Sequence, residues 1–125
     1  MIGYGATKLV KMGSGMQVFA LKSCDTCRKA VKALTAAGVS FEVTDVRADG
    51  VSEADLQAIL AQFGDQAINK ASTTWRGLDE AEKASDPLSL LRAHPTLMKR
   101  PVIRDGDHWT IGWKADVQSI WLGNA

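Results

Sequence analysis

Two cysteines with a fixed spacing are the residues of this chain best suited to chemistry. Cys24 and Cys27 are the only cysteines among 125 residues, and they stand in the segment LKSCDTCRKA, where an apolar run gives way to charged, helix-forming residues. A CxxC pair at the start of a helix is typical of redox chemistry, because the helix N-terminus stabilises a thiolate. We expect Cys24 to be the nucleophile and Cys27, one helical turn deeper, to resolve the bond that Cys24 forms.

The charged residues around the pair act on the Cys24 thiol in opposite directions. Lys22, Arg28 and Lys29 add positive charge, which lowers the pKa of a neighbouring thiol. Asp25 acts the other way, because a carboxylate disfavours a second negative charge beside it. We expect the cations and the helix dipole to dominate, since Asp25 can point towards solvent.

The cysteine pair has two other possible interpretations. A structural zinc site needs four ligands, and beyond the cysteines the chain offers only His94 and His108, whose separation misses the close spacing of zinc-finger histidines. Two incidental cysteines on a helix are the other alternative. The βαβ pattern around the pair favours a redox dithiol over both, and no metal is expected.

The elements that must position the pair follow from the hydrophobic pattern. Strands are predicted at 16–20 and 41–46 around a helix at 28–37, which Gly38 is expected to close. A helical block follows, and then strands at 101–104 and 108–111 that are joined by a turn at Asp105-Gly106-Asp107. A closing helix is predicted from the apolar stripe Trp113, Val117, Ile120 and Trp121. The first strand, helix and strand form a βαβ unit, so its two strands should be parallel. This order predicts an α/β fold, a thioredoxin- or glutaredoxin-like four-stranded mixed sheet with a helical insertion between its βαβ and ββα halves.

The helical block carries its own start signals. Ser52 can cap a helix, with Asp55 three residues later where a capping-box acid would stand. Asp86 followed by Pro87 announces another helix. Between them the segment ASTTWRG is expected to interrupt the helical pattern.

Length and composition predict one domain. Residues 1–15 are expected to be a flexible leader, and residues 16–122 a single domain with the helical insertion at about 51–95. The net charge of +1 favours neither direct nucleic-acid binding nor an anionic membrane, and no apolar run has the length of a membrane span. One close cysteine pair without a framework of others fits the reducing cytoplasm, and nothing demands more than a monomer.

A second candidate site feature precedes the third predicted strand. Lys99-Arg100-Pro101 enters this strand, and in a thioredoxin-like sheet that loop faces the nucleophile helix, with a proline there commonly cis. Arg100 would then lie beside Cys24 and offer a planar set of donors to an oxyanion or carboxylate. The alternatives are a solvated charge at the strand edge and an ordinary proline at the start of a strand.

The combination of CDTC after a first strand, TTWRGLDE in a helical middle and KRPVI before a hairpin resembles the arsenate reductase ArsC/Spx family, in particular its YffB-like thiol reductases. The resemblance covers about residues 16–122. It implies a thioredoxin-like fold with a helical insertion, Cys24 as nucleophile, Arg100 as the anion-binding arginine and Pro101 in cis. It also implies no tightly bound cofactor, a small thiol or oxyanion substrate, glutathione or another thiol as co-substrate, and thioredoxin or glutaredoxin as a partner.

The chain departs from arsenate reductases in its other cations. Those enzymes carry further arginines around the oxyanion, whereas the hairpin here ends without one at Thr110–Trp113, and the insertion offers Lys70 and Arg76. Lys70 is taken as a substrate-binding candidate, although lysine binds as a point charge rather than a fork. The negative charge of arsenate would be poorly compensated by the cations of such a site.

Two functions of different classes follow. The first is a cytosolic thiol-dependent reductase that uses the CxxC dithiol and is glutathione-linked or arsenate-reductase-like. The second is an Spx-like redox-switched regulator that binds RNA polymerase, since Spx-type regulators also carry a CxxC pair.

Overall fold

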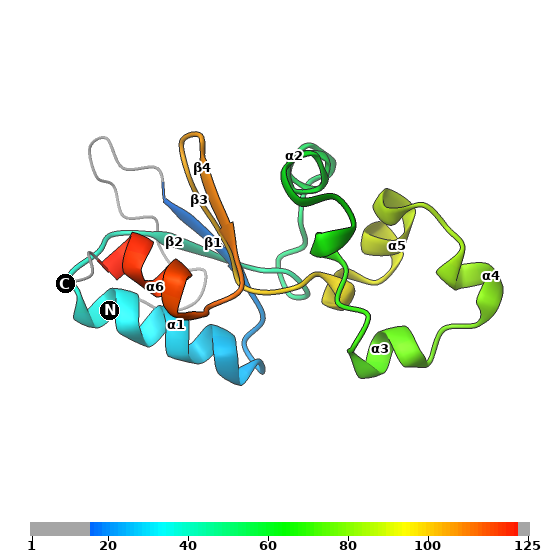
Figure 1. Cartoon of the computed structure of the whole chain (residues 1–125), viewed down its shortest axis with the longest axis horizontal. Coiled ribbons are helices and arrows are strands. Elements are labelled where there is room, and N and C mark those ends of the chain that lie inside the picture. Colours follow the sequence, from blue (N-terminus) through cyan, green and yellow to red (C-terminus); the bar gives the residue numbers. More distant parts are fainter. Residues whose placement is uncertain (1–15, 123–125) are drawn as a thin grey trace. The chain divides into compact units, whose positions relative to one another are not determined.

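A four-stranded mixed sheet carries the cysteine segment (Figure 1). The computed structural model describes residues 16–122, so the predicted leader at 1–15 lies outside the described residues. The strands are β1 (Gln17–Ala20), β2 (Glu42–Asp45), β3 (Val102–Asp105) and β4 (His108–Ile111). Strand β1 pairs in parallel with β2 and antiparallel with β3, and β4 completes the order β2-β1-β3-β4. The predicted mixed sheet is confirmed.

The chain divides into two compact units, which are described separately. One unit holds the described residues up to Asp45 together with those from Arg100 onward, and the other is Val46–Lys99. The helical unit therefore lies between β2 and β3 in the sequence, as the predicted fold class requires. No helix within residues 16–122 is both long and apolar enough to span a membrane.

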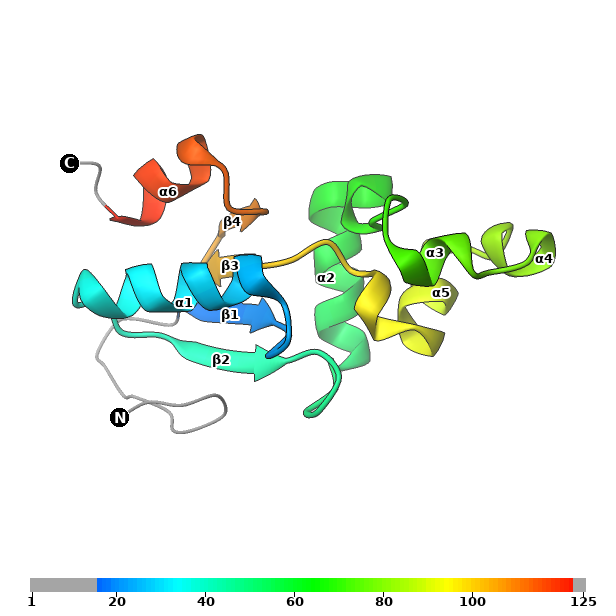
Figure 2. The same cartoon turned by 90° about the horizontal axis from the view of Figure 1, so that it is seen from below.

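Helices α1 (Asp25–Ala36) and α6 (Ala115–Leu122) lie on the same side of the sheet (Figures 1 and 2). Together with the strands they enclose one hydrophobic core, whose buried members are Met16, Val18, Ala20, Cys27, Leu34, Phe41, Val43 and Ile103. On α1 the buried residues recur at helical spacing, and the remaining face of the helix is exposed. This burial fixes the rotation of α1 and therefore the direction in which each cysteine points.

Two glycines close turns of this unit where the backbone has a positive φ. Gly38 follows α1 with φ 78°, and Gly106 forms the β3–β4 turn with φ 63°. Residues with a Cβ rarely adopt these angles, so glycine is the residue that ends the helix and reverses the chain at low cost. Both turns were predicted from the sequence and are confirmed.

The closing helix differs from its predicted stripe. Val117 is buried, but Ile120 is 47% exposed. The indole Nε1–H of Trp121 donates a hydrogen bond of 2.7 Å to the hydroxyl of Thr110 on β4, which turns that residue towards the sheet. Since neighbouring residues are about 100° apart around a helix, Ile120 then points away from the sheet. The sequence prediction for Ile120 was wrong.

The other unit is a set of short helices. They are α2 (Glu53–Phe63), a 3₁₀ helix (Gly64–Ala67), α3 (Thr73–Arg76), α4 (Glu80–Lys83), α5 (Pro87–Ala93) and a second 3₁₀ helix (Pro95–Leu97). An isolated antiparallel bridge joins Ile68 to Met98. The segment ASTTWRG, predicted to interrupt the helical pattern, contains α3, because the Ser72 hydroxyl accepts a hydrogen bond from the Trp75 amide and caps a single helical turn.

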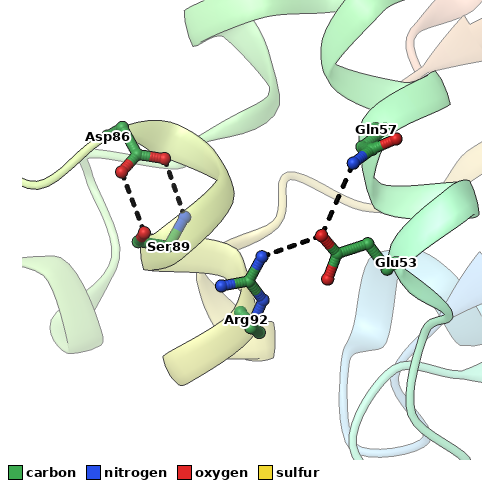
Figure 3. A network of polar contacts seen from close by, with 5 residues as sticks. All are labelled: Glu53, Gln57, Asp86, Ser89 and Arg92. Carbon is green, nitrogen blue, oxygen red and sulfur yellow. Dashed lines mark hydrogen bonds and ion pairs between the residues drawn. The ribbon is translucent and has the colours of Figure 1, made fainter.

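Local side-chain contacts hold the helix ends of this unit (Figure 3). The Ser52 hydroxyl accepts from the amide of Asp55 at 3.1 Å, and Asp86 accepts from Ser89, so both predicted caps are confirmed. Arg92 of α5 donates to Glu53 of α2 at 2.9 Å, and the same carboxylate oxygen accepts from Gln57. These contacts tie α2 to α5.

Candidate dithiol site

Cys24 occupies the N-cap position of α1. Its φ of −88° and ψ of 120° are extended, and its carbonyl accepts the first helical hydrogen bond from the amide of Arg28 at 3.0 Å. The amide of Cys24 donates to the carbonyl of Leu21 at 2.9 Å, which makes a tight turn of the loop between β1 and α1. The thiol is thus fixed at the positive end of the helix dipole.

The two sulfurs differ in burial. Cys27 is 0% exposed and packs in the core with Leu34, whereas Cys24 is partly exposed. Both are free thiols in this structure. This difference follows from the spacing, because a residue three positions into the helix lies on the stripe that faces the sheet while the N-cap residue lies beyond it.

Arg100 is brought to Cys24 by the sheet. Strand β3 runs antiparallel to β1 with Phe19 opposite Val102, so the N-terminal end of β3 lies beside the C-terminal end of β1, where the cysteine loop begins. The Arg100–Pro101 peptide bond is cis, as predicted, and Pro101 is fully buried. The Arg100 guanidinium lies close enough to hydrogen-bond to the Cys24 sulfur.

The Cys24 thiol is more acidic than an ordinary cysteine. Partial burial raises its pKa, but this effect is outweighed by the backbone amide and thiol of Cys27 and by the charge and hydrogen bond of Arg100, which together lower it. The thiolate is the nucleophilic form of cysteine. The predicted direction of the pKa shift is confirmed.

The Cys27 thiol behaves oppositely. Burial raises its pKa to about 12, with Cys24 adding to the increase while a backbone hydrogen bond from Leu21 and the charge of Arg100 oppose it. Two adjacent thiols cannot both ionise easily, since the second charge meets the first. The pair therefore consists of one activated thiol and one that stays protonated beside it.

The structure corrects the source of the positive charge. The sequence pointed to Lys22, Arg28 and Lys29, but the charge that lowers the Cys24 pKa comes from Arg100. Arg28 is ion-paired with Asp25 and also donates to the carbonyl of Lys22 at 3.2 Å. Because Arg28 is paired with the Asp25 carboxylate, the two opposite charges largely cancel, and Arg28 has little effect on the Cys24 thiol.

Lys70, the other predicted substrate-binding residue, belongs to the Val46–Lys99 unit. Its Nζ lies 5.4 Å from the ring centroid of Trp75, and Nζ of Lys83 lies 5.6 Å from the same ring. The role of Lys70 towards a substrate stays a prediction. Across residues 16–122, no cluster of three or more histidine, cysteine, aspartate or glutamate side chains is arranged to hold a metal ion.

One residue beside the site was missed from the sequence. Asp45 is 3% exposed, and its carboxylate accepts a hydrogen bond of 2.9 Å from the amide of Lys22 in the cysteine loop. The segment FEVTDV carried a signal, because Phe41, Val43 and Asp45 are spaced two apart and must share one face of the strand. An aspartate in line with two core residues marks a buried carboxylate.

Fold and site together define a thioredoxin-like protein with a CxxC pair at the start of its first helix. The chain belongs to the ArsC family, which matches residues 19–119. This confirms the resemblance inferred from CDTC and KRPVI.

Individual relatives agree with this assignment. An uncharacterized protein of Haemophilus influenzae is 42% identical over 101 residues, which cover 77% of this chain and 89% of that protein. The global transcriptional regulator Spx of Streptococcus pyogenes is 30% identical over 105 residues, covering 79% of this chain and 78% of the regulator. The solved structure of a YffB protein (PA3664) has a TM-score of 0.79 and 35% identity, covering 86% of this chain and 98% of that one.

Proposed function

We propose that this protein is a thiol-dependent reductase in which Cys24 is the nucleophile and Cys27 the resolving thiol. The observation that supports this best is the asymmetry of the pair, with the Cys24 pKa lowered beside Arg100 and the Cys27 pKa raised by burial. A poised thiolate next to a protonated partner is what a two-step thiol–disulfide exchange requires. The protein would act as a monomer in the cytoplasm, with glutathione or another thiol as co-substrate.

In the first step the Cys24 thiolate attacks one sulfur of a disulfide. A bond forms between the Cys24 sulfur and the attacked sulfur, the substrate S–S bond breaks, and the other substrate sulfur leaves as a thiolate that takes a proton from water. Arg100 holds the Cys24 sulfur anionic before the attack, and its guanidinium can also hydrogen-bond to an anionic substrate.

In the second step Cys27 becomes the nucleophile. Once Cys24 is part of a mixed disulfide it carries no charge, so its contribution to the raised Cys27 pKa is lost. The Cys27 thiol gives up its proton and attacks the Cys24 sulfur, which forms the Cys24–Cys27 disulfide and releases the bound group as a thiol. Two electrons from two external thiols, which become a disulfide, then restore the dithiol.

Substrate binding would fall to Arg100 and Pro101, with Lys70 as a further cation. Arg100 supplies one planar set of donors for a carboxylate or oxyanion, and Pro101 shapes the backbone that carries it. Arsenate would be a weaker substrate, since a highly charged oxyanion needs more than one such arginine. Thioredoxin or glutaredoxin are the protein partners that this chemistry suits.

Exposure to oxidised glutathione followed by mass spectrometry tests the roles of the two thiols. The wild type is expected to lose two hydrogens and form the Cys24–Cys27 disulfide, with the glutathione adduct only transient. The Cys27→Ser variant should keep one glutathione on Cys24, because nothing inside the protein can displace it. In Cys24→Ser, the buried Cys27 should stay unmodified over the same time. A stable adduct in the wild type, or rapid modification of Cys27 in Cys24→Ser, would contradict the assignment.

The similarity to Spx supports a second candidate function, a redox-switched regulator that binds RNA polymerase. In that case the dithiol and disulfide forms should differ in retention on immobilised RNA polymerase α subunit. The Cys24→Ser/Cys27→Ser double variant, which cannot be oxidised at this site, is the matched control. We expect no retention of either form, as the reductase proposal predicts, and retention that changes with oxidation in the wild type alone would favour the regulator.

A further inference from the structure

Asp45 is a carboxylate placed where the sheet would otherwise bury an apolar side chain. It is the last residue of β2, it is 3% exposed, and it follows the buried Val43 two positions earlier on the same face. Burying a carboxylate costs free energy unless its oxygens are hydrogen-bonded. Among the described residues of the sheet, only Thr110 is a comparably buried polar side chain.

The register of the sheet directs Asp45 to the cysteine loop. Asp45 lies opposite Ala20, the last residue of β1, at the point where the chain leaves the sheet for α1. Figure 2 shows the carboxyl ends of β1 and β2 side by side next to that loop. Across this gap Oδ2 of Asp45 accepts the hydrogen bond from the amide of Lys22 at 2.9 Å.

The peptide groups of the loop connect Lys22 directly to the dithiol. Only three residues, Leu21 to Ser23, separate β1 from Cys24, and the carbonyl of Leu21 accepts from the Cys24 amide. The backbone of Leu21 also hydrogen-bonds to Cys27. A shift of the Lys22 peptide would therefore move both the N-cap thiol and its resolving partner.

We propose that Asp45 is a positioning residue of the dithiol site, which holds the Lys22 peptide so that Cys24 faces Arg100 and the amide of Cys27. The inference rests on the proposed function of Cys24 as the reactive thiol. Asp45 touches no reacting atom and acts through the loop. An aspartate serves here because its side chain reaches the Lys22 amide, which an apolar side chain would leave without this acceptor.

The test measures alkylation of Cys24 by iodoacetamide as a function of pH, with peptide mapping to follow Cys24 alone. Asp45→Val removes the acceptor and places an apolar side chain that suits a buried strand. It should displace the pH profile to higher pH and slow alkylation at pH 7 by about three- to tenfold. Asp45→Asn retains an acceptor oxygen and should restore most of the rate. Thr110→Val, the matched loss of a buried polar group on the same sheet, should leave the profile unchanged.

The outcomes separate positioning from mere stability. Thermal unfolding identifies any variant that does not fold, and Asp45→Ala, which also lacks the acceptor, replaces Asp45→Val in that case. The proposal is overturned if the folded variants without the acceptor show the wild-type pH profile of Cys24 alkylation. It is also overturned if Asp45→Asn displaces that profile as far as those variants do. Failure of the proposed reductase function would be seen in a different experiment. In that case disulfide turnover would survive Cys24→Ser, while the alkylation profiles of the Asp45 variants could still differ from that of the wild type.

Discussion

Replacing Cys24 by serine is expected to lower the rate of disulfide reduction by about a thousandfold or more. A serine hydroxyl is almost wholly un-ionised at pH 7, so neither Arg100 nor the helix N-terminus has a thiolate to stabilise. The Cys27 thiol cannot substitute, because it is fully buried and this burial raises its pKa. The measurement is glutathione-coupled turnover with small disulfides, glutathione mixed disulfides and arsenate as substrates.

The control for this substitution is Thr35→Ala, which removes a hydroxyl bonded to the carbonyl of Val31 near the other end of α1. It should keep full turnover and the fold of the helix. Equal rates for the wild type and Cys24→Ser on every substrate would remove the enzyme proposal altogether. A rate lost equally in Thr35→Ala would mean that the assay reports the stability of α1 rather than the thiol.

Replacing Arg100 by methionine is expected to slow the reaction of Cys24 with iodoacetamide at pH 7 by about tenfold. Arg100 lowers the Cys24 pKa through its charge and its hydrogen bond, so its loss raises that pKa. Below the pKa the thiol is protonated and unreactive, and the rate rises with pH as thiolate forms. The Arg100→Met profile should therefore be displaced to higher pH and meet the wild-type plateau once both thiols are ionised.

Arg100→Lys separates charge from geometry in this experiment. It should recover much of the alkylation rate, because the positive charge is kept, yet raise the KM for an anionic disulfide, because lysine lacks the planar set of donors. Arg92→Met, which breaks the exposed pair with Glu53 in the other unit, is the control and should match the wild type. Coincident pH profiles for the wild type and Arg100→Met would show that Arg100 does not activate Cys24.

Local signals in the sequence were sufficient for the order of elements. Ser52 and Asp86-Pro87 start helices because the capping oxygen and the amides it satisfies lie within three residues of each other. The single-turn helix at Thr73–Arg76 was missed, since a helix this short has no hydrophobic periodicity to detect. The capping box of Asp79 and Glu82 that starts α4 is a local signal of the same kind, with its two residues three positions apart.

The candidate site also has features that the sequence predicted and features that it did not. The spacing of Cys24 and Cys27 was enough to predict which thiol is buried, because it depends only on helix geometry and the apolar stripe of α1. The sequence pointed to Lys22, Arg28 and Lys29 as the cations that lower the Cys24 pKa, but the charge that does so is that of Arg100, and Arg28 is paired with Asp25. Charge neighbours are set by three-dimensional distance, which sequence proximity does not measure.

By itself, the sequence determined the four-stranded mixed sheet, the two turns at Gly38 and Gly106, and a dithiol at the start of the first helix. All of these depend on interactions between residues close in the chain or on a strict hydrophobic period. The sequence also predicted that Arg100 lies beside Cys24, but the tertiary structure decided that Arg100 is the cation that lowers the Cys24 pKa and that Asp45 holds the cysteine loop. Both contacts depend on the pairing of β1 with strands far away in the chain, and strand register is fixed only when the whole core packs.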